Sequence, residues 1–292
     1  MGAIVAVVNK KGENAAETAV TMLKTLKHEH EEAFGIASPT EAKIEKTIEA
    51  LQKHGTESPT IIGHVFSKTL ATDKPQPAKL KNATLAFEGR IYQPTAKTLE
   101  TLIEKLRNHE EAAKALIRKS QGDFVFVLAE QEKLIAGRDT LGIRPLYYGE
   151  NASLAALASE RKALWKIGLC KTESFLPGNV AVVSKQGFRF KPVKTVDCPK
   201  PVQTSMQAAT EKLQTLLKKS IKERVSKLRE VAVAFSGGLD SSIIAFLAKN
   251  AGTDVHLIHV SLESQTETEQ TKKAAEWLKL PIHVYLYRRQ DV

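Results

Sequence analysis

The chain has 292 residues, of which 42% are hydrophobic and 26% charged, a composition typical of globular proteins and a length that allows two domains. No apolar run reaches the roughly 20 residues of a membrane-spanning helix, and the first eight residues lack the basic flank and cleavage site of a signal peptide, so we expect a cytoplasmic protein without a membrane partner. The net charge of +10 suits anionic ligands, but the basic residues are spread along the chain and do not by themselves indicate nucleic acid.

In the first 191 residues, apolar runs predict many strands and amphipathic spacing predicts helices grouped between them, which favours stacked α and β layers. The expected strands are 3–8, 60–66, 84–87, 90–92, 123–130, 133–136, 146–148 and 154–158. The expected helices are 15–28, 41–53, 98–106 and 110–120. We also expect a loop over 34–40, a long connection over 68–81 and a hairpin-like turn at Glu88-Gly89.

Residues 192–203 contain several prolines and are the predicted linker to a second domain, 204–292. A helix is expected to start at Thr204 or Ser205, with Gln207 completing a Thr-x-x-Gln capping box. Its apolar stripe is predicted to face a core and consists of Leu213, Leu216, Leu217, Ile221, Val225 and Leu228. Strands over 231–235, 254–262 and 282–287 alternate with helices over 243–248 and 265–278, which predicts a parallel, doubly wound sheet.

The strand 231–235 runs directly into Ser236-Gly-Gly-Leu-Asp-Ser-Ser242, and this order is strand, glycine-rich turn and helix N-terminus. Glycines let the backbone approach an anion closely, and the free N–H groups of a helix N-terminus favour phosphate. The hydroxyls add donors, and Asp240 can hold Mg²⁺ through the phosphates. The run lacks Walker A spacing, and the plainer alternative is a glycine turn capped by Ser241. We expect pyrophosphate to be bound by Ser236, Gly237, Gly238, Leu239, Asp240, Ser241 and Ser242.

This run resembles the PP-loop of the N-type ATP pyrophosphatases, whose pattern is Ser-Gly-Gly-x-Asp-Ser. The resemblance implies that ATP with Mg²⁺ is cleaved to AMP and pyrophosphate, through an acyl-adenylate that an amine then opens. A match to asparagine synthetase places Ala234 and Val260 where backbone groups of the family contact adenine. His256 and His259 are three apart on a strand and therefore on opposite faces, so they are not expected to form a metal pair.

Three segments of the first domain, Gly137–Gly149, Ala158–Leu164 and Leu176–Gly178, resemble the class II glutamine amidotransferase domain, which supplies ammonia in asparagine synthetase and related enzymes. The resemblance implies an α+β Ntn-hydrolase-like αββα sandwich over residues 1–191. A truncated α/β parallel-sheet domain of the adenine nucleotide α-hydrolase type is implied for 204–292. Within the first of these segments, Arg138 and Asp139 are charged neighbours, and we expect a structural role for them because the family's loop is structural.

The residues that perform glutamine hydrolysis in that family are altered here. Gly2 stands at the position of the nucleophilic cysteine and has no thiol or hydroxyl, and neither Cys170 nor Cys198 lies in a motif that could replace it. The family usually has Gly-His-Thr-Arg where this chain has Gly63–Phe66, and Asn-Gly-Glu where it has Glu88–Arg90. A carboxylate at position 88 would repel a developing oxyanion, so glutamine hydrolysis is not expected.

The resemblance therefore predicts part of an asparagine-synthetase-like ligase that activates a carboxylate such as aspartate for attack by ammonia. The family's later phosphate-binding motif and catalytic lysine have no match before Val292, so we expect a fragment or a chain completed by a second chain. One alternative is a non-catalytic nucleotide-binding regulatory or scaffold protein. The less favoured alternative is an RNA-modifying adenylating enzyme, whose binding would weaken steeply with salt.

Overall fold

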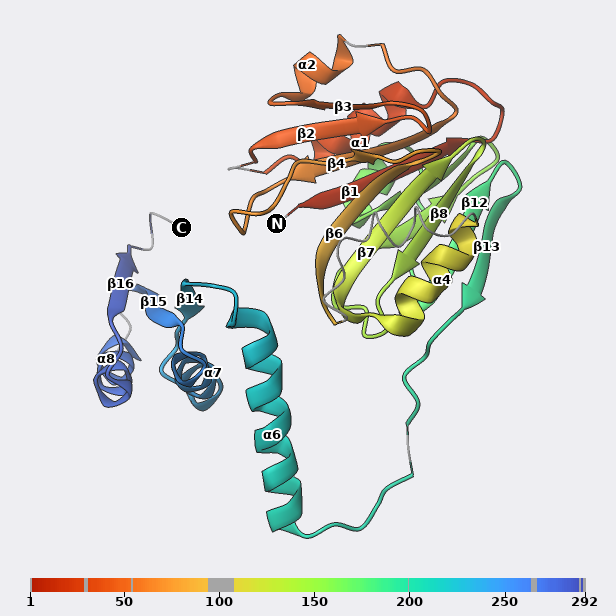
Figure 1. The fold of residues 1–292 in the computed structure, drawn as a ribbon. Coiled ribbons are helices and arrows are strands. Elements are labelled where there is room, and N and C mark those ends of the chain that lie inside the picture. Colours follow the sequence, from red (N-terminus) through yellow and green to blue (C-terminus); the bar gives the residue numbers. More distant parts are fainter. Residues whose placement is uncertain are drawn as a thin grey trace. The chain divides into compact units, whose positions relative to one another are not determined.

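The computed structural model describes residues 2–28, 31–53, 55–93, 108–198, 200–263, 267–288 and 290. The chain divides into two compact units, Met1–Cys198 and Pro199–Val292, each of which is described by itself (Figure 1). Within the described ranges, no helix has both the length and the apolar character needed to cross a bilayer.

The first unit contains two sheets whose neighbouring strands pair antiparallel. One sheet has the order β11 (Glu173–Ser174), β9 (Tyr147–Glu150), β10 (Leu154–Ala158), β1 (Ala3–Asn9), β4 (Thr60–Phe66), β2 (Ala33–Ala37) and β3 (Ala42–Glu45). The other has the order β13 (Gly187–Pro192), β12 (Asn179–Ser184), β8 (Lys133–Arg138), β7 (Gln121–Glu130), β6 (Thr84–Gln93) and β5 (Ala78–Lys79). The helices are α1 (Ala16–Leu26), α2 (Ile48–Gln52), α4 (His109–Lys119) and α5 (Arg161–Lys166).

The alternating side chains of β1 show how these elements form layers. Val5 and Val7 pack against α1, α2 and α5 on one side of the first sheet. Ile4, Ala6 and Val8 point the other way and pack against residues of β7, β8 and β12 between the two sheets. Apolar residues of α4 cover the outer face of the second sheet. The result is the αββα layering that was predicted.

Two predicted elements of the first unit are wrong. The expected loop over 34–40 is largely strand β2, whose five residues are all buried, because Gly35 lies inside a continuous apolar run that pairs with β3 and β4. The expected helix over 41–53 is strand β3 followed by the short helix α2. The other predicted helices 15–28 and 110–120 correspond to α1 and α4, and the predicted helix 98–106 lies outside the described residues.

The predicted hairpin at Glu88-Gly89 is also wrong, because β6 continues through both residues. Gly89 has a φ of +124°, and a Cβ there would overlap the carbonyl oxygen of Asp123 on β7. The glycine therefore allows the two strands to approach each other closely instead of reversing the chain.

The second unit is a three-stranded parallel sheet with the order β14 (Glu230–Ala234), β15 (Asp254–Leu262) and β16 (Ile282–Tyr287). Its helices are α6 (Met206–Val225), α7 (Leu239–Asn250) and α8 (Glu267–Leu278). The three predicted strands and the predicted strand–helix repeat are confirmed. Val255 and Leu257 of β15 form the core with Ala245 and Ala248 of α7 and with Ala275 of α8.

A doubly wound sheet was predicted, but in the described part of this unit the helices cover one face (Figure 1). The opposite face carries Ile258, Val260 and Tyr285, of which Val260 is 62% and Tyr285 50% exposed. The stripe of α6 also fails to face a core, since Leu213 is 57% exposed and only Ile221 of that helix packs against the core cluster.

The predicted capping box at the start of α6 is wrong by one residue. Ser205 is the N-cap and accepts a hydrogen bond from the backbone N–H of Ala208 at 3.2 Å. Gln207 consequently lies one position too early to complete the box, and its amide donates to Glu211 instead.

Candidate functional site

The seven residues that the sequence assigned to pyrophosphate follow β14 directly, with Ser236–Gly238 in the turn before α7 and Leu239–Ser242 in the first turn of α7 itself. Phe235 is buried and its backbone N–H donates to the carbonyl oxygen of Ile258 at 2.8 Å, which ties the end of β14 to β15. Gly237 then takes a φ of +75°, which favours glycine, and Gly238 is the N-cap of α7. No side chain caps this helix, so its first N–H groups are available to an anion.

Two hydroxyls lie together at the turn. Ser236 Oγ accepts a hydrogen bond from the N–H of Gly238 at 3.3 Å and lies 3.1 Å from Ser241 Oγ, which donates to the carbonyl oxygen of Gly238 at 3.2 Å. Ser236 and Asp240 are exposed, whereas Ser242 is half-buried. Leu239 is exposed as well. Because its side chain is apolar, only its backbone N–H is suited to contact a phosphate. The turn is open to solvent and lined by donors.

Buried side chains from β15 and α8 hold the first part of this turn, and sequence reasoning did not find them. His259 donates from Nδ1 to the carbonyl oxygen of Phe235 at 2.9 Å, and its Nε2 lies 3.4 Å from Thr268 Oγ1. Thr271 Oγ1 donates to the carbonyl oxygen of Ser236 at 3.0 Å and also lies 2.9 Å from that of Glu267. All three side chains are buried, with Thr271 0% exposed.

These contacts restrict the backbone of the turn. A Cβ at Gly237 would lie 2.9 Å from the Cα of Thr271, so α8 leaves room for a glycine at this point. Because a carbonyl oxygen only accepts, the bond to Phe235 fixes the proton of His259 on Nδ1. The sequence did contain a sign that His259 has a structural contact. This residue lies on the strand face that carries Val255 and Leu257, and a polar side chain on such a buried face needs a hydrogen-bond partner.

The residues predicted to contact adenine lie on the face of the sheet that the helices do not cover. Ala234 pairs with Ile258 across β14 and β15, and Val260 follows two residues later on the same face. His256 is also on this face, where its Nδ1 lies 3.2 Å from His283 Nε2 on β16. His256 and His259 point to opposite faces of the sheet, as predicted. The described residues contain no group of three or more potential metal ligands.

In the first unit, Gly2 at the start of β1 lies against Glu88 of β6. A Cβ at Gly2 would overlap Glu88 Oε2 and lie 2.9 Å from the carbonyl oxygen of Val65. The same carboxylate accepts a hydrogen bond from the buried His64 Nε2 at 3.3 Å, and its other oxygen lies 3.7 Å from Arg144 Nη1. The carboxylate thus fills the space that a side chain at position 2 would need.

The charges around Glu88 are largely paired. Arg144 also contacts Asp123 at 3.2 Å, and Arg90 contacts Asp73 at 2.7 Å. The two cysteines are exposed free thiols. Position 2 itself carries neither a sulfur nor a hydroxyl nucleophile.

Arg138 and Asp139 have the structural role that was expected. Arg138 is buried and donates to the backbone carbonyl oxygens of Arg144 and Phe175, at 2.7 and 2.6 Å. Burial lowers the pKa of Arg138 from its ordinary value. Asp139 accepts from the N–H groups of Leu141, Gly142 and Phe124 at 2.9, 2.8 and 3.2 Å. Together they fix the loop after β8.

Comparison with known proteins identifies both parts of the chain. A family model for asparagine synthase matches residues 212–292, and one for the glutamine amidotransferase domain matches residues 67–166. The chain is similar to the asparagine synthetases in both of these parts. It is 24% identical over its whole length to a Methanocaldococcus jannaschii protein named as an asparagine synthetase, and 33% identical over 149 residues, 48% of the chain, to asparagine synthetase B of Escherichia coli.

The chain spans only part of these asparagine synthetases, namely 59% of the M. jannaschii protein and 26% of the E. coli protein. Two solved structures share the fold. The glutamine phosphoribosylpyrophosphate amidotransferase of B. subtilis, complexed with ADP and GMP, has a TM-score of 0.56 and 15% identity, covering 97% of this chain and 65% of that one. An allosteric regulatory enzyme of purine biosynthesis has a TM-score of 0.58 and 14% identity, covering 97% of this chain and 80% of that one. The likeness is consistent with an Ntn-hydrolase-like fold for the first unit.

Proposed function

We propose that this chain is the nucleotide-binding part of an asparagine-synthetase-type ligase, which activates a carboxylate such as that of aspartate as an acyl-adenylate for attack by ammonia. We also propose that it does not hydrolyse glutamine itself. The observation that carries the proposal is the open, donor-lined turn from Ser236 to Ser242, which ends in an uncapped helix. Such a turn suits a leaving pyrophosphate, because its donors are fixed before charge develops.

The residues of the turn would share the binding of ATP. The N–H groups at Gly237 and of the first turn of α7 would bind phosphate oxygens, with the hydroxyls of Ser236 and Ser242 as further donors. The Gly238 N–H and the Ser241 hydroxyl donate within the turn, at 3.3 and 3.2 Å, and would exchange these bonds for bonds to phosphate. Asp240 fits Mg²⁺, because its exposed carboxylate lies in the first turn of α7 and hard oxygen ligands are those that Mg²⁺ takes. Bound Mg²⁺ would shield the phosphate charge. The backbone at Ala234 and Val260 would contact the adenine.

The arrangement around Gly2 supports the absence of glutamine hydrolysis. An acyl-transfer mechanism needs a nucleophile and donors aimed at an oxyanion. At this place the chain has a glycine and, against it, the carboxylate of Glu88, which would repel the oxyanion. Ammonia would then come from solution or from another protein.

The uncovered face of the second unit supports a further partner. Val260, Tyr285 and the stripe of α6 expose apolar surface that a complete synthetase domain would be expected to bury. We propose that additional polypeptide, in a second chain or in a longer form of this one, completes the domain. The cytoplasmic location stays a prediction.

Calorimetric titration with ATP and Mg²⁺ tests the proposal, with Ser236→Ala and Asp240→Asn as variants of the turn. Ser174, which lies outside this turn, gives a matched control, Ser174→Ala. We expect saturable binding that both turn variants weaken and the control leaves unchanged. Absence of ATP binding would overturn the proposal.

A second assay separates a ligase from a nucleotide-binding protein that performs no chemistry. ATP–pyrophosphate exchange would be measured with a panel of amino acids, with and without the candidate partner. Binding without exchange under every condition would favour the non-catalytic alternative. Release of glutamate from glutamine would contradict the proposed loss of glutaminase activity.

A further inference from the structure

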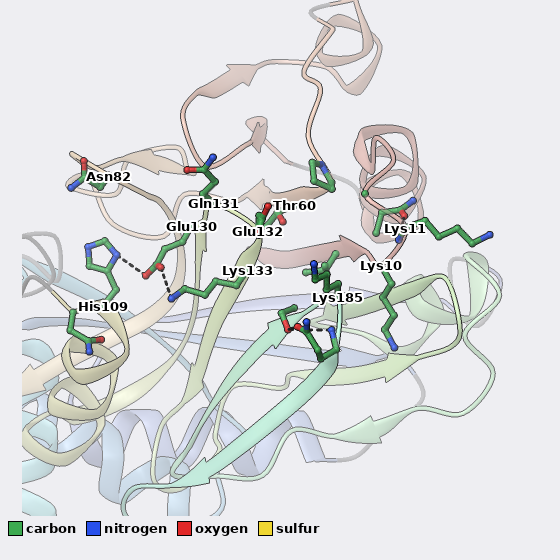
Figure 2. Close-up of a pocket in the computed structure, with 17 residues that line it drawn as sticks. Lys10, Lys11, Thr60, Asn82, His109, Glu130, Gln131, Glu132, Lys133 and Lys185 are labelled. Atoms are coloured by element: carbon green, nitrogen blue, oxygen red, sulfur yellow. Dashed lines mark hydrogen bonds and ion pairs between the residues drawn. The ribbon is translucent and has the colours of Figure 1, made fainter.

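The first unit contains a cavity of about 950 Å³ that lies away from Gly2 and Glu88 (Figure 2). It is found where β1 ends and β4 begins, since Val8 and Asn9 line it together with Pro59 and Thr60. Gly2 is at the other end of β1, which is seven residues long, so the two places are separated by roughly 20 Å at the ordinary rise of a strand. The cavity is therefore distinct from the altered glutaminase site.

Buried polar residues form the floor of this cavity. Asn9 is 9% and Thr60 1% exposed, and Thr60 Oγ1 has no hydrogen-bond partner among the described residues. Asn9 also shapes the turn that follows β1. Its side-chain Oδ1 accepts a hydrogen bond from the backbone N–H of Lys11 at 2.9 Å, and its backbone carbonyl oxygen accepts one from the N–H of Gly12 at 3.2 Å. The backbone that carries Lys10 and Lys11 is thus fixed at the edge of the cavity.

The charge of the cavity is positive and partly uncompensated. Lys10, Lys11, Lys133 and Lys185 line it, against Glu130 and Glu132 (Figure 2). Lys10 is paired with Glu150 at 2.6 Å, and Lys133 with Glu130 at 2.9 Å. Lys11 and Lys185 have no carboxylate within 4.0 Å in the part of the chain that the structure describes. Two cations from different turns are therefore left for a ligand.

The uncharged groups of the lining suggest the rest of the ligand. Four residues with side-chain amides, which both donate and accept, line the cavity: Asn82, Asn108, Gln131 and Gln186. The amide oxygen of Asn108 caps α4 and that of Gln186 accepts from Ser184, so these two amides offer their NH₂ groups as donors. A volume of about 950 Å³ is within the range of small-molecule sites. We propose that this cavity binds a small phosphorylated metabolite, with Lys11 and Lys185 as the cations that attract its phosphate and with its polar body against the amides.

The test uses the full chain and ribose 5-phosphate as the probe, followed by site-resolved amide chemical shifts. We expect saturable shifts at Lys11, Gly12 and Lys185. Signals from Gly237 and Gly238 are recorded in the same titration, so binding at the nucleotide turn is read separately. Citrate, a carboxylate anion of similar size, serves as the comparison and should bind more weakly.

Three variants make the prediction specific. Lys11→Ala and Lys185→Ala should each weaken binding roughly tenfold, because each removes a charged hydrogen-bond donor. Glu132→Gln should strengthen binding severalfold by removing a carboxylate that has no ion pair among the described residues. Lys171→Ala removes an exposed lysine outside the cavity and should change nothing. Unchanged affinity in both cavity lysine variants, or no saturable shift at the cavity amides, would overturn the proposal.

Discussion

Replacement of Thr271 by valine tests whether the buried contacts between α8 and the turn prepare the nucleotide site. Valine keeps the shape of threonine but removes the hydroxyl that donates to the carbonyl oxygen of Ser236 at 3.0 Å. The Thr271 side chain is 0% exposed, and its bond to the turn is partly buried. We therefore expect the free energy of unfolding to fall by about 1 kcal/mol, the usual net contribution of one hydrogen bond.

The same change should weaken ATP binding. If the turn must regain its bound geometry at a cost of about 1.4 kcal/mol, the apparent affinity falls roughly tenfold. Calorimetric titration with ATP and Mg²⁺ measures the affinity, and urea unfolding of the same samples measures stability. Thr271→Ser keeps the hydroxyl and should restore most of the affinity.

Thr215→Val is the matched control for this experiment. Thr215 Oγ1 donates to the carbonyl oxygen of Glu211 at 2.9 Å, and Thr271 Oγ1 lies at the same distance from the carbonyl oxygen of Glu267, four residues earlier in its helix. Among the described residues, no hydrogen bond joins Thr215 to the turn. It should leave ATP affinity unchanged. If Thr271→Val unfolds more easily yet binds ATP as tightly as the wild type, Thr271 stabilises the fold alone and the reasoning is refuted.

Three further changes have expected outcomes. Gly237→Ala should cost about 1–3 kcal/mol of stability and abolish measurable ATP binding, because φ is +75° and α8 leaves no room for a Cβ; wild-type titration curves would contradict this. The pKa of Glu110 is lowered to about 2, chiefly by the hydrogen bond from Lys191. The ionised carboxylate therefore contributes fully to the stability of the folded protein above pH 4.5, and this contribution is lost as the pH falls towards 2. Glu110→Gln should therefore cost about 1–2 kcal/mol at pH 7, after allowance for solvent screening, and progressively less in urea unfolding below pH 4.5. Gly2→Ala should cost about 1 kcal/mol alone and less in combination with Glu88→Ala, and additive costs in the double-mutant cycle would show that the two positions do not meet.

The nucleotide turn could be predicted because its signal is local. Seven consecutive residues after an apolar strand contain the glycines, hydroxyls and carboxylate, and the structure places them in the turn before α7 and in the first turn of that helix. The contacts that hold this turn could not be predicted in the same way. His259 and Thr271 lie 24 and 35 residues from the carbonyls that they contact, so only the packing of β15 and α8 brings them together.

Two of the errors in the fold involve glycines within strands. Gly89 was interpreted as a turn and residues 34–40 as a loop, whereas Gly89 and Gly35 both lie within strands where neighbouring backbone comes close. The spacing of the α6 stripe correctly predicted a helix, but periodicity alone does not say whether a partner covers the apolar face.

The contact between Gly2 and Glu88 has a consequence for the history of the chain. A thiol introduced at position 2 would collide with the carboxylate, and loss of the carboxylate alone would provide no nucleophile. A change from glycine to cysteine at position 2 would therefore need a second change at position 88, so this pair of residues is hard to alter by single mutations.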